Sequence, residues 1–221
     1  MSAYEVRQEI VRLGKLLYEK GFIAASDGNI SVRIDDRHVL ATPTCMCKGM
    51  MSSEDMVTID MQGRRLEGFR DVSSEIGMHL MIYRMRPDVN AIVHAHPTTA
   101  TGFAAAGIAL DKPLVSEVVL ALGSVPLAKY ATPGSQALSD ALAPLVPEHN
   151  AILMANHGVV AYAEDLATAF MNMETVEHFA KISLTARLLG REEVLNEQQV
   201  ADLVQTRKKL QAAKMALLKR G

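Results

Sequence analysis

The order of apolar patterns along the chain constrains the fold most, because strand-like and helix-like segments alternate irregularly. Two pairs of short β-branched segments, "NISVRI" with "HVLATPT" and "MVTIDM" with "RRLEG", are each separated by turn residues and predict two β-hairpins. Further strands are expected in "NAIVHAHP", "SVPLAKY", "AILMANHG" and "VVAYA". Helices are expected at residues 3–20, 74–85, 98–106, 136–145, 165–190 and 196–220. Hairpins and crossovers together predict an α/β fold with a mixed sheet covered by helices.

The size and charge of the chain limit its partners. With 221 residues it is long enough for one sizeable core, and we expect a single domain over residues 1–221 with a helical tail from about residue 196. Its 23 basic and 25 acidic residues give a formal charge of −2. This balance argues against nucleic acid or an anionic membrane as the main partner and favours a small-molecule substrate.

Nothing in the sequence predicts export or membrane insertion. No apolar run approaches the roughly 18 residues that would span a bilayer, and the N-terminal segment is a charged amphipathic helix rather than a signal peptide. Cys45 and Cys47, the two cysteines, are too close in sequence for a relaxed disulfide. We therefore expect a reducing, cytoplasmic location.

Three of the seven histidines occupy apolar segments and are candidate metal ligands. His94 and His96 form H-x-H in an expected strand, where residues two apart point to the same face. His157 ends a second apolar strand, and the glycine after it would let the backbone turn away. Three imidazoles with a fourth position are typical of catalytic zinc. Buried, hydrogen-bonded core histidines are the alternative.

The segment "VSSEIGMHL" adds a carboxylate to this set. Read alone, its serines and Glu75 form a capped helix start with an acidic first turn. Beside the three histidines, Glu75 would complete a zinc tetrahedron. His79, four residues later, is expected to pack or to bond a ligand rather than bind metal. The other histidines, His38, His149 and His178, are expected at the surface.

Three turns of small polar residues are candidate phosphate contacts. Gly28 and Asn29 offer backbone N–H groups, Thr44 offers a hydroxyl, and Ser73 with Ser74 stands at an expected helix start. Each one alone is compatible with an ordinary turn. Together they predict a neutral phosphate pocket that has no obligatory lysine or arginine, in which backbone donors and a nearby metal balance the charge.

These motifs resemble the class II aldolase/adducin family, nearest to its members that cleave L-fuculose 1-phosphate. The matching segments are "DGNISVR", "ATPT", "SSE", "RPDVNAIVHAHPTTA" and "ANHGVVAYAEDLATAF", which follow the family's order over about residues 4–190. The resemblance implies a three-layer α/β/α sandwich around a mixed, largely antiparallel sheet. It also implies a homotetramer with active sites at subunit interfaces.

The resemblance assigns roles to individual residues. It implies one Zn²⁺ per subunit, or another divalent metal, on His94, His96 and His157, with Glu75 as resting ligand and catalytic acid/base. It implies substrate phosphate contacts from Gly28, Asn29, Thr44, Cys45, Ser73 and Ser74, with Cys45 where aldolases of the family commonly have glycine.

Two departures from the family concern a second acid/base. The stretch "KPLVSEVVLALG" lacks the tyrosine that those aldolases contribute across an interface, and Glu117 is its nearest titratable residue. No tyrosine follows Tyr162, and Tyr130 is expected to pack rather than to take part in catalysis. The proton donor to the leaving aldehyde is therefore unassigned.

The expected activity is that of a class II aldehyde-lyase. It would cleave a ketose 1-phosphate, such as L-fuculose 1-phosphate or a related deoxyketose phosphate, into dihydroxyacetone phosphate and a short aldehyde such as lactaldehyde. Alternatives with the same metal–enediolate chemistry are a pentulose 5-phosphate 4-epimerase, which typically has Asp in place of Glu75, a sugar-acid phosphate decarboxylase, or a methylthioribulose-phosphate dehydratase. A non-catalytic adducin-type interaction module is a further alternative, although such modules lack the histidines.

Overall fold

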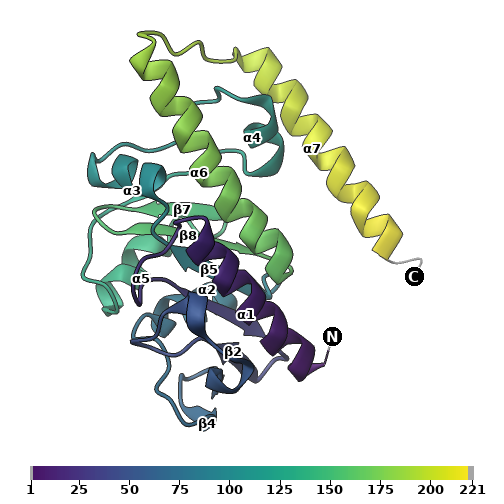
Figure 1. The fold of residues 1–221 in the computed structure, drawn as a ribbon. Helices are drawn as coiled ribbons and strands as arrows, with labels where there is room; N and C mark the ends of the chain where they lie inside the picture. The colour runs from purple at the N-terminus through teal and green to yellow at the C-terminus, as the bar shows by residue number, and fades with distance from the viewer. Residues whose placement is uncertain (1, 219–221) are drawn as a thin grey trace.

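A computed structural model describes residues 2–218 and contains one eight-stranded sheet with helices on both faces (Figure 1). The strand order is β4-β3-β2-β1-β5-β8-β7-β6, and every pair is antiparallel except β6 with β7. The strands are β1 (Asn29–Arg33), β2 (His38–Ala41), β3 (Val57–Asp60), β4 (Arg65–Glu67), β5 (Ala91–Ala95), β6 (Leu127–Ala128), β7 (Ala151–Met154) and β8 (Gly158–Ala163).

The helices divide between the two faces of the sheet. They are α1 (Ala3–Glu19), α2 (Ile76–Met85), α3 (Thr98–Ala105), α4 (Ser116–Ala121), α5 (Gln136–Leu142), α6 (Leu166–Leu188) and α7 (Glu197–Leu218), with short 3₁₀ turns η1 (Lys48–Met50) and η2 (Ser53–Asp55). One core joins α1, α3 and α6 to the sheet, and a second core joins α2 and α5 to its other face. The predicted α/β/α sandwich with a mixed, largely antiparallel sheet is confirmed.

The central strands bury both faces, which explains their continuous apolar runs. All five residues of β5 and all six of β8 are buried, and the two strands pair from Ala91 with Ala163 to Ala95 with Val159. The two hairpins predicted near the N-terminus are present as β1–β2 and β3–β4. The sheet centre thus holds the strand that carries His94.

Several boundaries differ from the prediction. Helix α2 begins at Ile76 rather than Ser74, because Glu75 takes the N-cap position and its side chain makes no cap hydrogen bond. The strand expected over 124–130 shrinks to two edge residues, since Pro126 has no N–H for the ladder. Helix α4 was not predicted, because its valines favour strands.

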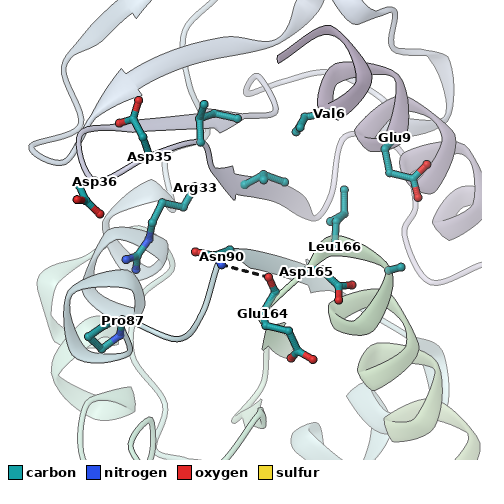
Figure 2. Close-up of a pocket in the computed structure, with 13 residues that line it drawn as sticks. Val6, Glu9, Arg33, Asp35, Asp36, Pro87, Asn90, Glu164, Asp165 and Leu166 are labelled. Carbon is teal, nitrogen blue, oxygen red and sulfur yellow. Dashed lines mark hydrogen bonds between the residues drawn. The ribbon is translucent and has the colours of Figure 1, made fainter. Parts of the chain in front are cut away.

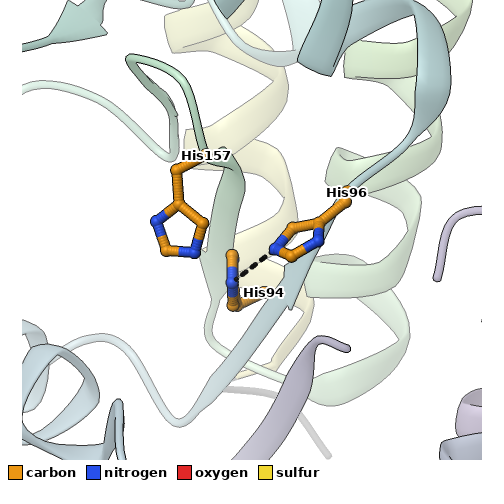
Figure 3. Close-up of side chains that lie close together, drawn as sticks. All are labelled: His94, His96 and His157. Atoms are coloured by element: carbon orange, nitrogen blue, oxygen red, sulfur yellow. Dashed lines mark hydrogen bonds between the residues drawn. The ribbon is translucent and has the colours of Figure 1, made fainter. Parts of the chain in front are cut away.

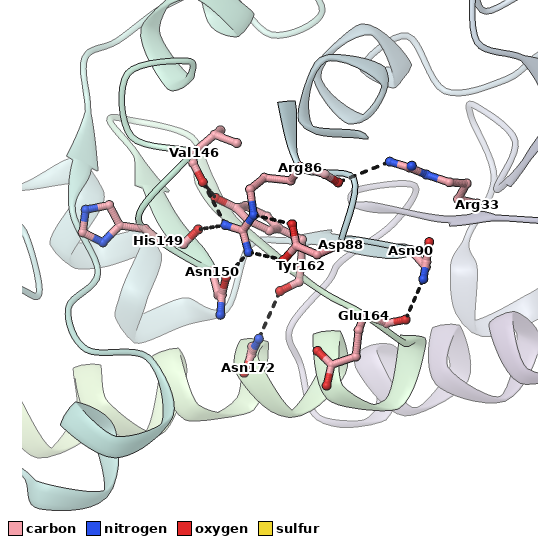
Figure 4. Close-up of polar contacts among 10 residues, drawn as sticks. All are labelled: Arg33, Arg86, Asp88, Asn90, Val146, His149, Asn150, Tyr162, Glu164 and Asn172. Carbon is pink, nitrogen blue, oxygen red and sulfur yellow. Dashed lines mark hydrogen bonds and ion pairs between the residues drawn. The ribbon is translucent and has the colours of Figure 1, made fainter. Parts of the chain in front are cut away.

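Arg86 fixes the end of α2 to the β7–β8 hairpin (Figure 4). Its guanidinium donates to both carboxylate oxygens of Asp88, to the carbonyl of Val146 at 3.0 Å and to Oδ1 of Asn150 at 3.1 Å. It also lies over the ring of Tyr162, 5.8 Å from the centroid. The network thus holds the C-terminal end of α2 against β8 and the segment before β7.

The predicted charged tail is helix α7, which packs against α4 and otherwise extends away from the sheet (Figure 1). The tail was expected to reach residue 221, and residues 219–221 lie outside the described part of the chain. Within residues 2–218, no helix combines the length and the apolar character that a membrane span needs.

Candidate metal centre

The three predicted histidines meet at one end of the central strands (Figure 3). His94 lies in β5, His96 follows the end of β5, and His157 lies in the turn between β7 and β8. One ring nitrogen of each lies within 4.8 Å of the others, and the Nε2 atoms of His94 and His96 are 3.2 Å apart. The alternation of side chains along β5 brings the first two together, as the sequence predicted.

His157 reaches the site by a different route from the one predicted. It does not end a strand but occupies the third position of a turn in which Asn156 has a φ of +54° and reverses the chain. Gly158 gives space instead: a Cβ atom there would lie 2.5 Å from Cδ2 of His96 and 2.7 Å from the carbonyl oxygen of Ala95. The glycine therefore permits the contact between the two histidine-bearing segments.

Hydrogen bonds at the far side of two rings determine which nitrogens are free. Nδ1 of His94 is 2.9 Å from the carbonyl oxygen of Val159, which can only accept, so Nδ1 carries the proton. Nδ1 of His96 is 3.3 Å from the carboxylate of Asp27. When the rings are neutral, their Nε2 atoms are lone-pair donors that face one another, as metal-bound histidines do.

Glu75 faces the same point from the start of α2. Its Oε2 lies 3.2 Å from Nε2 of His94, and its Oε1 lies 3.2 Å from Nε2 of His157. Burial alone would raise the pKa of Glu75, but its interactions with His94, His157 and the amide of Asn29 outweigh burial and hold the pKa well below its ordinary value. The carboxylate is therefore ionised and requires positive charge at the centre of the cluster.

A divalent cation fits this donor set. Burial, and after it the proximity of His94, lowers the pKa of His157 to about 4, so its ring is neutral near pH 7. Burial also lowers the pKa of His96. Neutral imidazole nitrogens facing an ionised carboxylate would repel it, and Nδ1 of His157 and Oε1 of Glu75 have no hydrogen-bond partner among the described residues. Three imidazoles and one carboxylate match a tetrahedral site for a metal such as zinc.

His79 is not a ligand but a buried neighbour, as expected. It is 1% exposed, and its Nδ1 lies 2.7 Å from the hydroxyl of Ser31, which also contacts the hydroxyl of Tyr83 at 2.8 Å. Burial lowers the pKa of His79 to about 3, so the ring stays neutral. Of the remaining histidines, His178 is exposed and the partly exposed His38 bonds Asp35.

The first predicted phosphate turn is tied closely to the metal centre. Gly28 has a φ of +67°, and a Cβ atom there would lie 2.7 Å from the carbonyl oxygen of His94. The side-chain amide of Asn29 donates to Glu75 at 2.9 Å. This amide therefore orients Glu75, and a phosphate contact by Asn29 would fall to its backbone N–H.

The other two turns lie beside each other. The backbone N–H of Thr44 donates to the carbonyl of Asp71 at 3.0 Å, and Cys45 has a φ of +52°, which fits the glycine common in the family. The hydroxyl of the buried Ser73 accepts from the N–H of Glu75 at 3.3 Å, while Ser74 is exposed. Their phosphate contacts stay a prediction.

Two residues of this region were missed by the sequence analysis. Asp27 contacts His96, and Lys48 lies 2% exposed with its ammonium bonded to carbonyl oxygens of both the first and the second turn. A buried cation therefore lies under two of the predicted turns, whose phosphate contacts stay a prediction. The pair Asp27-Gly28 before a strand and the position of Lys48 after C-x-C were the available signals.

Glu117 lies apart from the histidines. It is exposed near the start of α4 and lines a cavity of about 800 Å³ against α6, and none of the four predicted metal ligands lines that cavity. Tyr130 is 62% exposed, so the expected packing within the subunit is wrong for this residue. A role for Glu117 across a subunit interface stays a prediction.

A second cavity, of about 550 Å³, lies between α1, the end of β1 and the β8–α6 junction (Figure 2). Its lining is acidic and includes Glu9, Asp35, Asp36 and Asp165. Asn90 donates to the carbonyl of Glu164 at 3.2 Å there. None of the residues predicted for the active site lines this cavity.

Comparison with known proteins identifies the family and several relatives of the chain. Residues 8–184 match the model of the class II aldolase and adducin N-terminal domain. A 3-oxo-tetronate 4-phosphate decarboxylase of Pectobacterium atrosepticum is 37% identical over 186 residues, covering 82% of this chain and 84% of its own. A 5-deoxy-D-ribulose 1-phosphate aldolase of Bacillus thuringiensis serovar kurstaki is 34% identical over 205 residues, covering 92% and 95%.

A solved structure agrees with these matches. An L-fuculose 1-phosphate aldolase superposes with a TM-score of 0.86 at 34% identity, covering 94% of this chain and 98% of its own. The family depends on divalent metals, in agreement with the histidine cluster. By the family model and by relatives above 30% identity, the chain belongs to the class II aldolase and adducin N-terminal domain family.

Proposed function

We propose that the protein is a zinc-dependent decarboxylase of a phosphorylated 3-oxo sugar acid such as 3-oxo-tetronate 4-phosphate, the alternative raised by the sequence analysis. One observation carries this proposal. Among the described residues, Glu75 is the only acid–base side chain that contacts the Nε2 side of the histidines. Within one subunit the described residues thus offer one proton-transfer group at the site, which suffices for a reaction that needs only one.

Decarboxylation meets that condition. The bond between C1 and C2 breaks, its electron pair stays on C2 and spreads onto the C3 oxygen, and carbon dioxide leaves from a carboxylate that has no proton to lose. Glu75, which is ionised at rest, takes up one proton from water and delivers it to C2, which gives dihydroxyacetone phosphate. A bound divalent metal would supply Lewis-acid stabilisation of the negative charge on the C3 oxygen.

The second candidate is the aldolase expected from the sequence. It is favoured by the similarity to the L-fuculose 1-phosphate and 5-deoxy-D-ribulose 1-phosphate aldolases. Aldol cleavage begins at an uncharged hydroxyl, so a second group must remove its proton. Glu117 from a neighbouring subunit would have to fill that role, which links this candidate to the expected homotetramer.

A product assay separates the candidates. Both reactions release dihydroxyacetone phosphate, but only decarboxylation releases carbon dioxide and only aldol cleavage releases an aldehyde. The full-length protein with added zinc should release equal amounts of carbon dioxide and dihydroxyacetone phosphate from 3-oxo-tetronate 4-phosphate, and a chelator should stop it. Turnover of ketose 1-phosphates alone would support the aldolase, and that activity should then fall in Glu117→Gln.

Two variants test the assigned residues. Glu75→Gln should keep zinc and lose nearly all turnover, while Glu54→Gln, which changes an exposed glutamate, should behave like the wild type. His94→Ala should lose zinc by elemental analysis, whereas His178→Ala should keep it. Full zinc occupancy in His94→Ala would reject the ligand set, and absence of zinc from the purified wild type would revive the non-catalytic module.

The proposed assembly rests on the family resemblance, whereas the proposed location and partners rest on the cysteine spacing and the charge balance of the sequence. We propose a homotetramer with active sites at subunit interfaces and a cytoplasmic location, and no role for nucleic acid or membrane. Light scattering coupled to size-exclusion chromatography should give four times the mass of one chain. A monomer that is fully active would reject the interfacial site.

A further inference from the structure

Lys48 is a buried cation without a matching anion. Its residue is 2% exposed, and its ammonium donates to the carbonyl oxygens of Ser26 at 2.7 Å and Met46 at 2.8 Å. Among the described residues no carboxylate lies within ion-pair distance of it. An ammonium has three N–H donors, so one is left without a partner there. Buried charges in proteins are normally paired, since removing an ion from water costs several kcal/mol.

Close packing of α1 fixes the lysine in this position. A Cβ atom on Gly14 would lie 2.8 Å from the carbonyl oxygen of Lys48, and one on Gly49 would lie 2.6 Å from the ring of Tyr18. The two glycines let α1 lie directly on η1, which excludes water from the lysine stem. The ammonium therefore has little freedom to turn towards solvent.

The two carbonyls that Lys48 holds belong to the two turns predicted to bind phosphate. Ser26 precedes Gly28 and Asn29, and Met46 follows Thr44 and Cys45. Burial lowers the pKa of Lys48, while the acids Asp27 and Glu75 act in the opposite direction. The ammonium is thus within electrostatic range of the metal centre and lies behind both turns.

We propose that Lys48 is the positioning residue of the substrate phosphate site, in that its ammonium joins the two turns and its buried charge offsets the phosphate dianion. This inference rests on the function proposed above. It explains how a pocket lined by small polar residues can bind a dianion without a surface arginine. The bound phosphate supplies the counter-charge that the protein lacks.

The binding of inorganic phosphate to the zinc-loaded full-length chain tests this role by calorimetry. Lys48→Met keeps the length of the stem and removes the charge, and its phosphate affinity should fall about tenfold or more. Lys15→Met is the matched control, because it removes the same charge from the surface: Lys15 lies on α1 with its side chain 66% exposed. It should bind phosphate like the wild type.

The kinetic readout separates a phosphate role from general damage. Since the phosphate is remote from the bond that breaks, Lys48→Met should raise KM about tenfold and leave kcat within about threefold. Zinc content should stay at one per chain. A lower kcat with unchanged KM and unchanged phosphate affinity would overturn the proposal and leave a purely structural lysine.

A second variant covers the case in which Lys48→Met does not fold. Lys48→Gln can still donate to a carbonyl but carries no charge, and it should also bind phosphate about tenfold more weakly. Wild-type affinity in Lys48→Gln would overturn the proposal while the decarboxylase function stands. Failure of the wild type itself to bind phosphate or any sugar phosphate would overturn both.

Discussion

The side-chain amide of Asn29 donates a hydrogen bond of 2.9 Å to Oε2 of Glu75, which links the start of β1 to the carboxylate that faces the histidines. The same oxygen lies 3.2 Å from Nε2 of His94, and Asn29 pairs with His94 across β1 and β5. The strand pairing and the hydrogen bond thus place three groups of the site in one fixed arrangement.

Removing this amide should impair turnover more than metal binding. In Asn29→Ala, Glu75 loses the donor that orients it, and kcat should fall about ten- to a hundredfold, while zinc stays bound through three histidines. Steady-state kinetics and elemental analysis measure both quantities. Asn90→Ala, which removes an exposed amide outside the site, is the control. A wild-type kcat in Asn29→Ala would contradict the orienting role.

Gly158 should be intolerant of even one methyl group. A Cβ atom there would lie 2.5 Å from Cδ2 of His96, so Gly158→Ala must displace a metal ligand or the end of β5. Zinc affinity should fall about tenfold or more by competition with a chelator. Gly102→Ala is the control, because nothing lies within 4 Å of that position in α3. Equal zinc affinity in the two variants would show that the ring of His96 moves aside without weakening zinc binding.

The sequence predicted the histidine cluster and the sheet because both depend on local order. H-x-H places two side chains on one face of a strand whatever surrounds it, and short turns between β-branched segments leave few pairings other than hairpins. The position of Glu75 was predictable for the same reason, since a helix start was visible at Ser73 and Ser74 even though α2 begins at Ile76.

The missed features depend on contacts between distant segments. Lys48 lies behind the two turns predicted to bind phosphate, where Gly14, on another helix, packs against η1. Gly158 is required by its close approach to His96 rather than by its own backbone conformation. Asp27 contacts His96, which follows it by 69 residues in the sequence. No pattern in one segment contains such information, so these roles needed the structure.

His79 should make the protein less stable in mild acid. Its pKa is about 3 when folded, against 6.5 for an unperturbed histidine, because burial disfavours the charged ring. The unfolded chain therefore binds more protons between these values, and the free energy of unfolding falls as the pH falls below about 6.5. Between pH 7.5 and 5.5 this one group should remove roughly 1 kcal/mol.

Urea unfolding of His79→Gln at the two pH values measures this contribution. The variant should be less stable at pH 7.5, but its loss between pH 7.5 and 5.5 should be smaller than that of the wild type by roughly 1 kcal/mol. His178→Gln, at an exposed position of α6, should show the wild-type loss. An identical pH dependence in His79→Gln would mean that other groups cause the acid sensitivity.

Cys45 should tolerate glycine and reject a β-branched residue. Its φ of +52° lies in the left-handed region, where a non-glycine side chain is strained, and a β-branched side chain is strained most. In Cys45→Gly the relief of strain and the greater freedom of the unfolded chain oppose each other, so stability should stay within about 0.5 kcal/mol of the wild type. Cys45→Val should lose about 1–2 kcal/mol of unfolding free energy and weaken phosphate binding, since the turn that holds Thr44 must distort.

Cys47→Val is the matched control, because Cys47 has an ordinary φ of −65° that valine adopts readily. Equal unfolding free energies for the two valine variants would show that the backbone at Cys45 carries no strain.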